Sequence, residues 1–143
     1  MIPFYSRLPE LASRETRGVI IPPDQFGVPA GHYAFVEFYC EEEDCDCRRV
    51  LLQVWKGDRP GVVLATINYG WESLAFYEKW TGRRDDARDI VGACLDPLNL
   101  QGEHADVFLG ILRDFVRDDP AWPRRFAEHY RLFKGAKPSA REN

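Results

Sequence analysis

Residues 33–55 have the sequence YAFVEFYCEEEDCDCRRVLLQVW, in which two apolar runs flank a short acidic loop that contains cysteine. Both runs are dense in β-branched and aromatic residues, which favour strands. A third run of the same kind, residues 62–69, follows the sequence GDRPG, whose glycines and proline are typical of a turn. Three strand-length runs with short connections predict an antiparallel meander.

The alternation of side chains along the first run gives the sheet two apolar faces. Ala34, Val36 and Phe38 lie on one face, and Phe35 is among the residues on the other. Because neither face is polar enough to be freely solvated, we expect helices to cover one face and the N-terminal arm or a second subunit to cover the other.

The second half of the chain has the spacing of helices. Residues 71–80 predict a short helix that ends at Gly82, and a second helix is expected from Asp85 towards Cys94. Apolar residues three and four positions apart between 105 and 116 predict the clearest helix, and a last one begins near Pro123. Strands followed by helices predict an α+β fold: a small antiparallel β-meander of three or four strands, with three to four helices packed on one face.

The 143-residue chain has the length of a single domain that buries a substantial core. Its expected organisation is a proline-rich N-terminal arm (1–30), an antiparallel sheet with the cysteine-rich hairpin (31–69), a helical half (70–134) and a frayed tail (135–143).

The overall charge and hydropathy pattern exclude several classes of partner. A net charge of −4 disfavours binding to nucleic acid or to anionic membranes. No window approaches the ~18 consecutive apolar residues of a membrane span, and the first residues lack the features of a secretory signal. We therefore expect a soluble cytoplasmic protein, in which clustered cysteines are more often metal ligands or catalytic thiols than disulfides.

Three of the four cysteines, Cys40, Cys45 and Cys47, fall within eight residues with the spacing C-x4-C-x-C. Cys40 ends one predicted strand and Cys47 precedes the next, so both lie at the same end of the hairpin. Acidic neighbours raise thiol pKa values, which disfavours a free reactive thiolate, and they attract a dication. Zinc tolerates sulfur ligands and takes four of them in a tetrahedron, so the pattern predicts a zinc site.

The predicted fourth ligand is Cys94, with Asp46 or a water molecule as alternatives. His32 lies at the far end of the first strand, on the order of 26 Å from Cys40. His104 and His129 fall in predicted helices, where capping, surface or packing roles are more common than metal binding.

Two interpretations of the cysteines compete with the metal site. They can act as small hydrophobic residues in a polar loop, with Cys40 and Cys47 as a cross-strand pair, or they can form a redox switch.

The chain has no HExxH, Walker, GxSxG or GxGxxG motif. The leading hypothesis is a non-catalytic module with a structural zinc site that acts in protein interaction or regulation with a protein partner of unknown identity. The alternatives are an enzyme (a hydrolase with an open zinc site, or a thiol redox protein) and a metal-free dimeric domain. We also predict a homodimer through the face that carries Phe35, Leu51 and Trp55, because these large apolar residues are unsuited to water.

Overall fold

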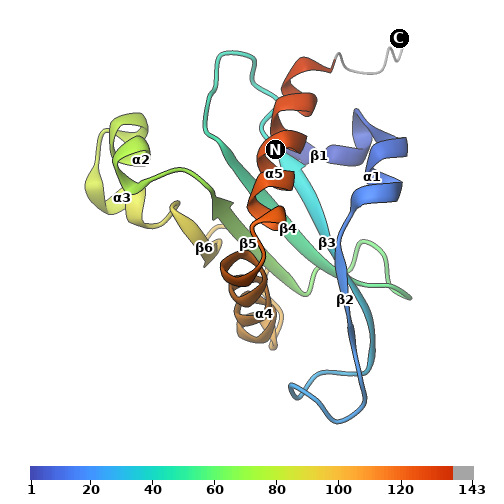
Figure 1. The fold of residues 1–143 in the computed structure, drawn as a ribbon. Helices are drawn as coiled ribbons and strands as arrows, with labels where there is room; N and C mark the ends of the chain where they lie inside the picture. Colours follow the sequence, from blue (N-terminus) through green and yellow to red (C-terminus); the bar gives the residue numbers. More distant parts are fainter. Residues whose placement is uncertain (137–143) are drawn as a thin grey trace.

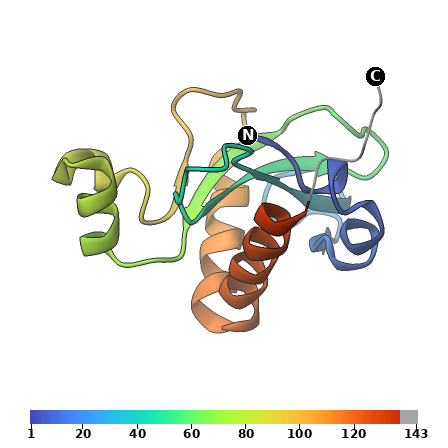
Figure 2. The same ribbon diagram turned by 90° about the horizontal axis from the view of Figure 1, so that it is seen from above.

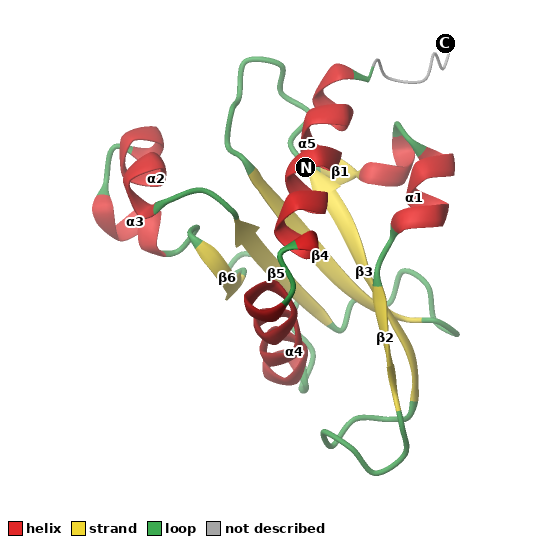
Figure 3. Cartoon of the chain, viewed as in Figure 1, coloured by secondary structure: helices red, strands yellow, loops and turns green. Residues whose placement is uncertain are grey.

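The computed structural model describes residues 1–136, which form six strands, five α-helices and one 3-10 helix (Figures 1 and 3). The predicted α+β fold is confirmed. The elements in chain order are β1 (Ile2–Pro3), η1 (Phe4–Ser6), α1 (Pro9–Glu15), β2 (Gly18–Ile21), β3 (Gly31–Tyr39), β4 (Arg49–Lys56), β5 (Ala65–Gly70), α2 (Leu74–Thr81), α3 (Arg84–Arg88), β6 (Gly92–Leu95), α4 (Ala105–Asp118) and α5 (Ala121–Gly135). The predicted frayed tail, beyond its first two residues, lies outside the described part of the chain.

The six strands form one antiparallel sheet with the order β1-β3-β4-β5-β6, and β2 pairs with the other half of β3. The central meander β3–β4–β5 is the predicted one. Phe35 of β3 lies opposite Val54 of β4, and Leu52 of β4 lies opposite Ile67 of β5. The sheet exceeds the predicted three or four strands because three short strands, β1, β2 and β6, extend it.

The N-terminal arm is part of the sheet and of the core. Ile2 of β1 lies opposite Tyr39, and Ile20 of β2 lies opposite His32, so the arm pairs with both ends of β3. The 3-10 helix between these pairings buries Phe4. Two consecutive prolines follow β2 and stop its ladder, because proline has no N–H to donate. The arm thus completes the edge of the sheet and pairs with β3 instead of covering the face opposite α4 and α5.

The segment from Asp85 to Cys94 differs from the predicted helix. Helix α3 ends at Arg88, Gly92 has a positive φ of 69°, and β6 then pairs with β5. Cys94 lies opposite Asn68 in this pairing. Asp89 caps α3 in the right-handed conformation, and the left-handed Gly92 then begins β6, whose residues satisfy the backbone groups at the otherwise free edge of β5. The predicted helical half therefore contains a strand.

Helices α4 and α5 cover one face of the sheet, as predicted (Figure 2). The face they cover carries the odd-numbered residues of β3. Tyr33 packs against Phe108 of α4, and Phe35 meets Trp122 of α5 edge to face with ring centroids 5.9 Å apart. The hydrophobic core lies between these layers.

The placement of Phe35 corrects the predicted dimer face. Phe35 is 1% exposed and points into the core, whereas Leu51 and Trp55 belong to the opposite face with Phe38. Successive residues of a strand point to opposite faces, and Phe35 is in register with core-facing Val54. Phe35 therefore cannot share a surface with Leu51 and Trp55.

Helices α2 and α3 form a pair beside the end of β5, away from the two helices that cover the sheet (Figure 1). The Ser73 hydroxyl accepts a hydrogen bond from the Phe76 N–H at the start of α2, and Gly82 ends this helix in the left-handed conformation. The Tyr77 hydroxyl donates to the carbonyl of Arg48 over 2.6 Å. This bond connects the helix pair to the β3–β4 hairpin.

A buried histidine joins three elements inside the core. His129 of α5 is 1% exposed, and its Nδ1 and Nε2 lie 2.7 and 2.8 Å from carboxylate oxygens of Glu37 and Glu15. Tyr39 donates its hydroxyl proton to Glu37, and Phe4 stacks on the imidazole. Burial alone disfavours the charged ring, but the hydrogen bonds and charges of the two carboxylates outweigh it and raise the pKa of His129.

We expect replacement of His129 by Gln to lower the free energy of unfolding by about 3 kcal/mol at about pH 6, because Glu37 would keep a buried charge without its cation. The pKa of His129 is raised in the folded state. The stability that the charged imidazole contributes is therefore fully present below the unfolded-state pKa and is lost as pH rises through the folded-state pKa. The deficit of the variant should therefore shrink at about pH 9. Chemical denaturation at both pH values measures this difference in the free energy of unfolding. His104→Gln, at a partly exposed site, is the control. An equal deficit at both pH values would contradict the prediction.

Candidate metal centre

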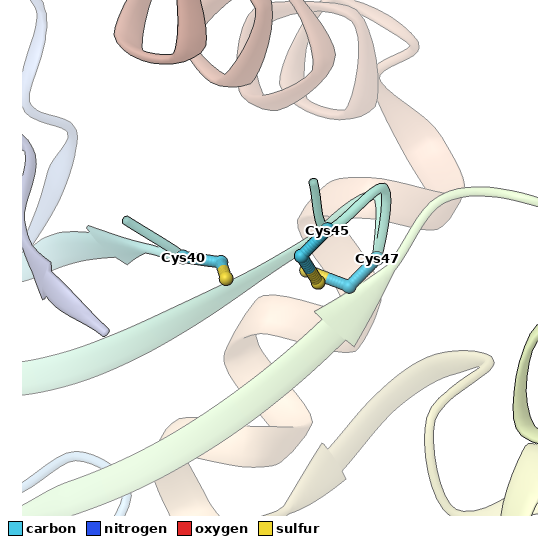
Figure 4. Close-up of side chains that lie close together, drawn as sticks. All are labelled: Cys40, Cys45 and Cys47. Carbon is cyan, nitrogen blue, oxygen red and sulfur yellow. The ribbon is translucent and has the colours of Figure 1, made fainter. Parts of the chain in front are cut away.

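The hairpin that joins β3 to β4 brings three cysteines together. Pairing of Phe38 with Leu51 places the end of β3 beside the start of β4, so Cys40 and Cys47 enter the connecting loop at the same end of the sheet. Cys45 lies within that loop. The three sulfur atoms are all within 4.8 Å of one another (Figure 4). The predicted convergence of these residues is therefore present.

The backbone after Cys47 is held in an unusual conformation. Arg48 has a positive φ of 43°, which a side chain with a Cβ rarely adopts. The Tyr77 hydroxyl donates a hydrogen bond to the Arg48 carbonyl over 2.6 Å. This bond links the turn after Cys47 to helix α2.

Burial and the charges of neighbouring thiols favour the protonated form of Cys45 and Cys47 in the metal-free protein. Burial, followed by the charge of Cys47 and the contact with Cys40, raises the pKa of Cys45 to about 12. Burial also raises the pKa of Cys47, although the Arg49 guanidinium partly offsets it. A thiol with a raised pKa is a poor nucleophile at neutral pH, whereas a divalent cation favours the thiolate form of all three. The environment fits a metal site better than a reactive thiol.

Helix α5 holds the cysteine loop in place. The Tyr130 hydroxyl donates to Asp46 Oδ1 over 3.1 Å and lies 3.4 Å from the Cys45 carbonyl oxygen. The Lys134 ammonium donates to the Glu42 carbonyl over 2.7 Å. These bonds join a loop near residue 45 to a helix more than eighty residues later in the chain, so the loop has a defined position against the core.

Sequence reasoning did not assign Tyr130 to this site. Its four-residue spacing from Phe126 places it on the apolar face of α5, but helical spacing does not show which loop that face meets. No local sequence signal identifies this contact.

The acidic alternative ligand, Asp46, is engaged by other partners. Arg48 Nε lies 3.1 Å from both carboxylate oxygens, and its Nη2 lies 2.9 Å from Oδ2. The hydrogen bond from Arg48 is the main cause of the lowered pKa of Asp46, and Tyr130 adds to it. Asp46 is therefore an acceptor for Arg48 and Tyr130, and it does not join the sulfur cluster among the described residues.

The structure does not bring Cys94 to the other three cysteines. It lies on β6, opposite Asn68, and β4 and β5 separate it from β3. Cys40 at β3 is three strand spacings from β6 and Cys47 beside β4 is two, roughly 14 and 10 Å, whereas two sulfurs bound to one zinc ion lie only about 3.8 Å apart. The Cys94 thiol instead donates to the carbonyl of Asp89 over 2.7 Å. Short β6, which replaces the predicted helix, causes this separation.

The three histidines also lie elsewhere. His129 is held by Glu37 and Glu15, His104 precedes α4 and contacts Glu103, and His32 pairs with Ile20 at the far end of β3. His129 packs in the core, within the range of roles predicted for it, and it also forms a buried ionic contact with Glu37 and Glu15. Within residues 1–136, the side chains that come close enough together at this hairpin to bind one metal ion are those of the three cysteines.

These three donors fit a soft divalent cation. Thiolates bind zinc about 2.3 Å from the metal, so the sulfurs would need to move closer together only slightly. Cys40 and Cys45 are half-buried and Cys47 is buried, which leaves one side of the cluster accessible. The arrangement can hold a metal ion at the tip of the hairpin.

Comparison of the chain with protein-family models, with curated proteins and with solved structures finds no match. Within residues 1–136, no helix combines the length and the apolar character needed to cross a membrane.

We expect Tyr130→Phe to lower the free energy of unfolding by about 1 kcal/mol, because it removes the hydroxyl that bonds to the loop at Asp46. Amide hydrogen exchange of residues 41–47 should become faster in the variant, since the loop loses a tertiary contact. Tyr5→Phe, at an exposed site, is the matched control. Unchanged exchange in the loop would show that this contact does not hold it.

Proposed function

We propose that this protein is a zinc-binding module in which Cys40, Cys45 and Cys47 hold the metal and the bound metal fixes the β3–β4 loop. The observation that carries the proposal is the convergence of three sulfur atoms within 4.8 Å at one hairpin tip. Zinc suits this donor set because it accepts thiolates and is stable in the presence of cellular reductants.

The surroundings of the cluster support a structural role for the metal. The loop that supplies the cysteines also contacts α5 through Tyr130 and Lys134, and Arg48 connects it to α2. A metal at this point would tie these contacts to the sheet, and the free energy of metal binding would then add to the free energy of folding. This role requires a reducing compartment such as the cytoplasm, where thiols stay available for metal.

We further propose that the module acts through binding to another protein, in interaction or regulation. The hairpin tip is exposed at Glu41, Glu42 and Glu43, next to the half-buried Cys40 and Cys45, so a partner can reach the site from solvent. The enzyme alternative would use the same three ligands and an exchangeable fourth position.

Protein purified without added metal should contain about one zinc ion per chain, measured by elemental analysis. Cys47→Ser should weaken zinc binding more than about a hundredfold, because it removes a buried ligand. Removal of zinc should lower the melting temperature of the parent but hardly that of Cys47→Ser, since only the parent gains folding free energy from the metal.

Cys94→Ser is the matched control. Because Cys94 lies apart from the cluster, this variant should bind zinc as tightly as the parent. Metal-free protein in which all four thiols react freely under native conditions would rule out the proposed site. A loss of zinc in Cys94→Ser would show that a different set of ligands binds it.

The homodimer stays a prediction, now restricted to the face of Leu51 and Trp55. We expect sedimentation to show a dimer that Trp55→Lys dissociates, because a buried lysine at an apolar interface carries an unpaired charge. Trp80→Lys, at an exposed tryptophan of α2, should leave the dimer intact. A parent protein that stays monomeric at high concentration would contradict the prediction.

A further inference from the structure

The metal site has three protein donors, while zinc in a structural site takes four. The fourth donor decides whether the site is closed within the chain or by another molecule. The two side chains predicted for this position are engaged elsewhere among the described residues, Asp46 by Arg48 and Tyr130 and Cys94 by the Asp89 carbonyl. The buried His129 is likewise held by two carboxylates.

The charges around the sulfurs indicate what kind of donor fits. A divalent cation with three thiolates carries one net negative charge. Arg49 follows Cys47 by two residues, its Nη1 donates to Asn68 Oδ1 over 2.9 Å, and its buried Nε has no hydrogen-bond partner among the described residues. Its one positive charge balances that net charge, so a neutral fourth ligand leaves the site compensated.

The neighbouring ion pairs do not change this balance. Arg48 lies against Asp46 and Glu72, and the remaining nearby cation, Lys134, donates to the Glu42 carbonyl. An anionic fourth ligand would add an uncompensated charge beside a loop that is already acidic. Imidazole is a neutral donor that zinc binds readily, and three cysteines with one histidine are a common structural zinc set.

The solvent-exposed side of the site is negatively charged. Glu41, Glu42, Glu43 and Asp44 are consecutive and exposed. They attract positive charge at the approach to the half-buried Cys40 and Cys45. A ligand that arrives from this side therefore gains from basic neighbours.

We propose that the fourth metal ligand is the imidazole of a histidine outside the described chain, carried by a positively charged segment of a partner protein. This inference rests on the proposed metal site. The partner closes the coordination sphere, and the acidic loop selects its charge.

Cobalt(II) bound to the full chain tests the inference, because thiolate-to-cobalt charge-transfer absorption reports the cysteines and the d–d bands report the fourth ligand. An acetylated, amidated Lys-His-Lys peptide should change the d–d bands saturably, and Lys-Ala-Lys should not. Glu-His-Glu should bind roughly tenfold more weakly at low salt, and the difference should shrink as salt is added. The affinity of N-acetylhistidine amide should lie between those of Lys-His-Lys and Glu-His-Glu.

A double variant, Glu41→Gln with Glu43→Gln, should keep the charge-transfer band and lose most of the tenfold preference. Cys94→Ser should respond to the peptides like the parent.

The possible failures are distinguishable. Absence of the charge-transfer band would overturn the metal site and this inference together. A band that is present but unaffected by Lys-His-Lys would show that the chain itself fills the fourth position. A stronger response to 2-mercaptoethanol than to the histidine peptides would overturn the neutral donor. Binding of N-acetylhistidine amide as tight as that of Lys-His-Lys would overturn the charged partner segment.

Discussion

The pairing of β3 with β4 is the constraint on which the rest of the structure depends. Its register places Phe35 opposite Val54 and so fixes which face of the sheet receives α4 and α5. The same register brings the end of β3 beside the start of β4, where Cys40 and Cys47 lie. A shift by one residue would turn the core side chains to the face opposite the helices and move the sulfurs apart, because side chains alternate along a strand.

Strand β3 also organises the polar interior. Glu37 lies on its core face, within 2.7 Å of His129, and Glu15 of α1 binds the other ring nitrogen. One imidazole thus joins the N-terminal arm, the sheet and the last helix. Such a buried ionic group does not necessarily add net stability, but the loss of any one partner leaves a buried charge unpaired. It specifies how these three elements meet.

Two contacts from α5 reach the cysteine loop from the same helix that carries His129. Tyr130 is the next residue along, and Lys134 lies one turn further. The histidine network and the loop contacts are therefore mechanically linked through one rigid element. A metal at the hairpin tip would be held by a loop whose position depends on the docking of α5.

The amino-acid sequence by itself determined the meander, the two amphipathic helices and the three-cysteine cluster, because strand alternation, helical spacing and hairpin closure are local properties. The tertiary structure alone decided the rest. Gly92 and the free edge of β5 turned a predicted helix into β6, which carried Cys94 away from the site. Residues far apart in the chain, such as Glu15, Glu37 and His129, met only through packing. The register of β3 with β4 decided that Phe35 faces α5 and does not share a face with Leu51 and Trp55. Local periodicity cannot specify such long-range contacts, since it fixes which face of an element is apolar but not which neighbour covers it.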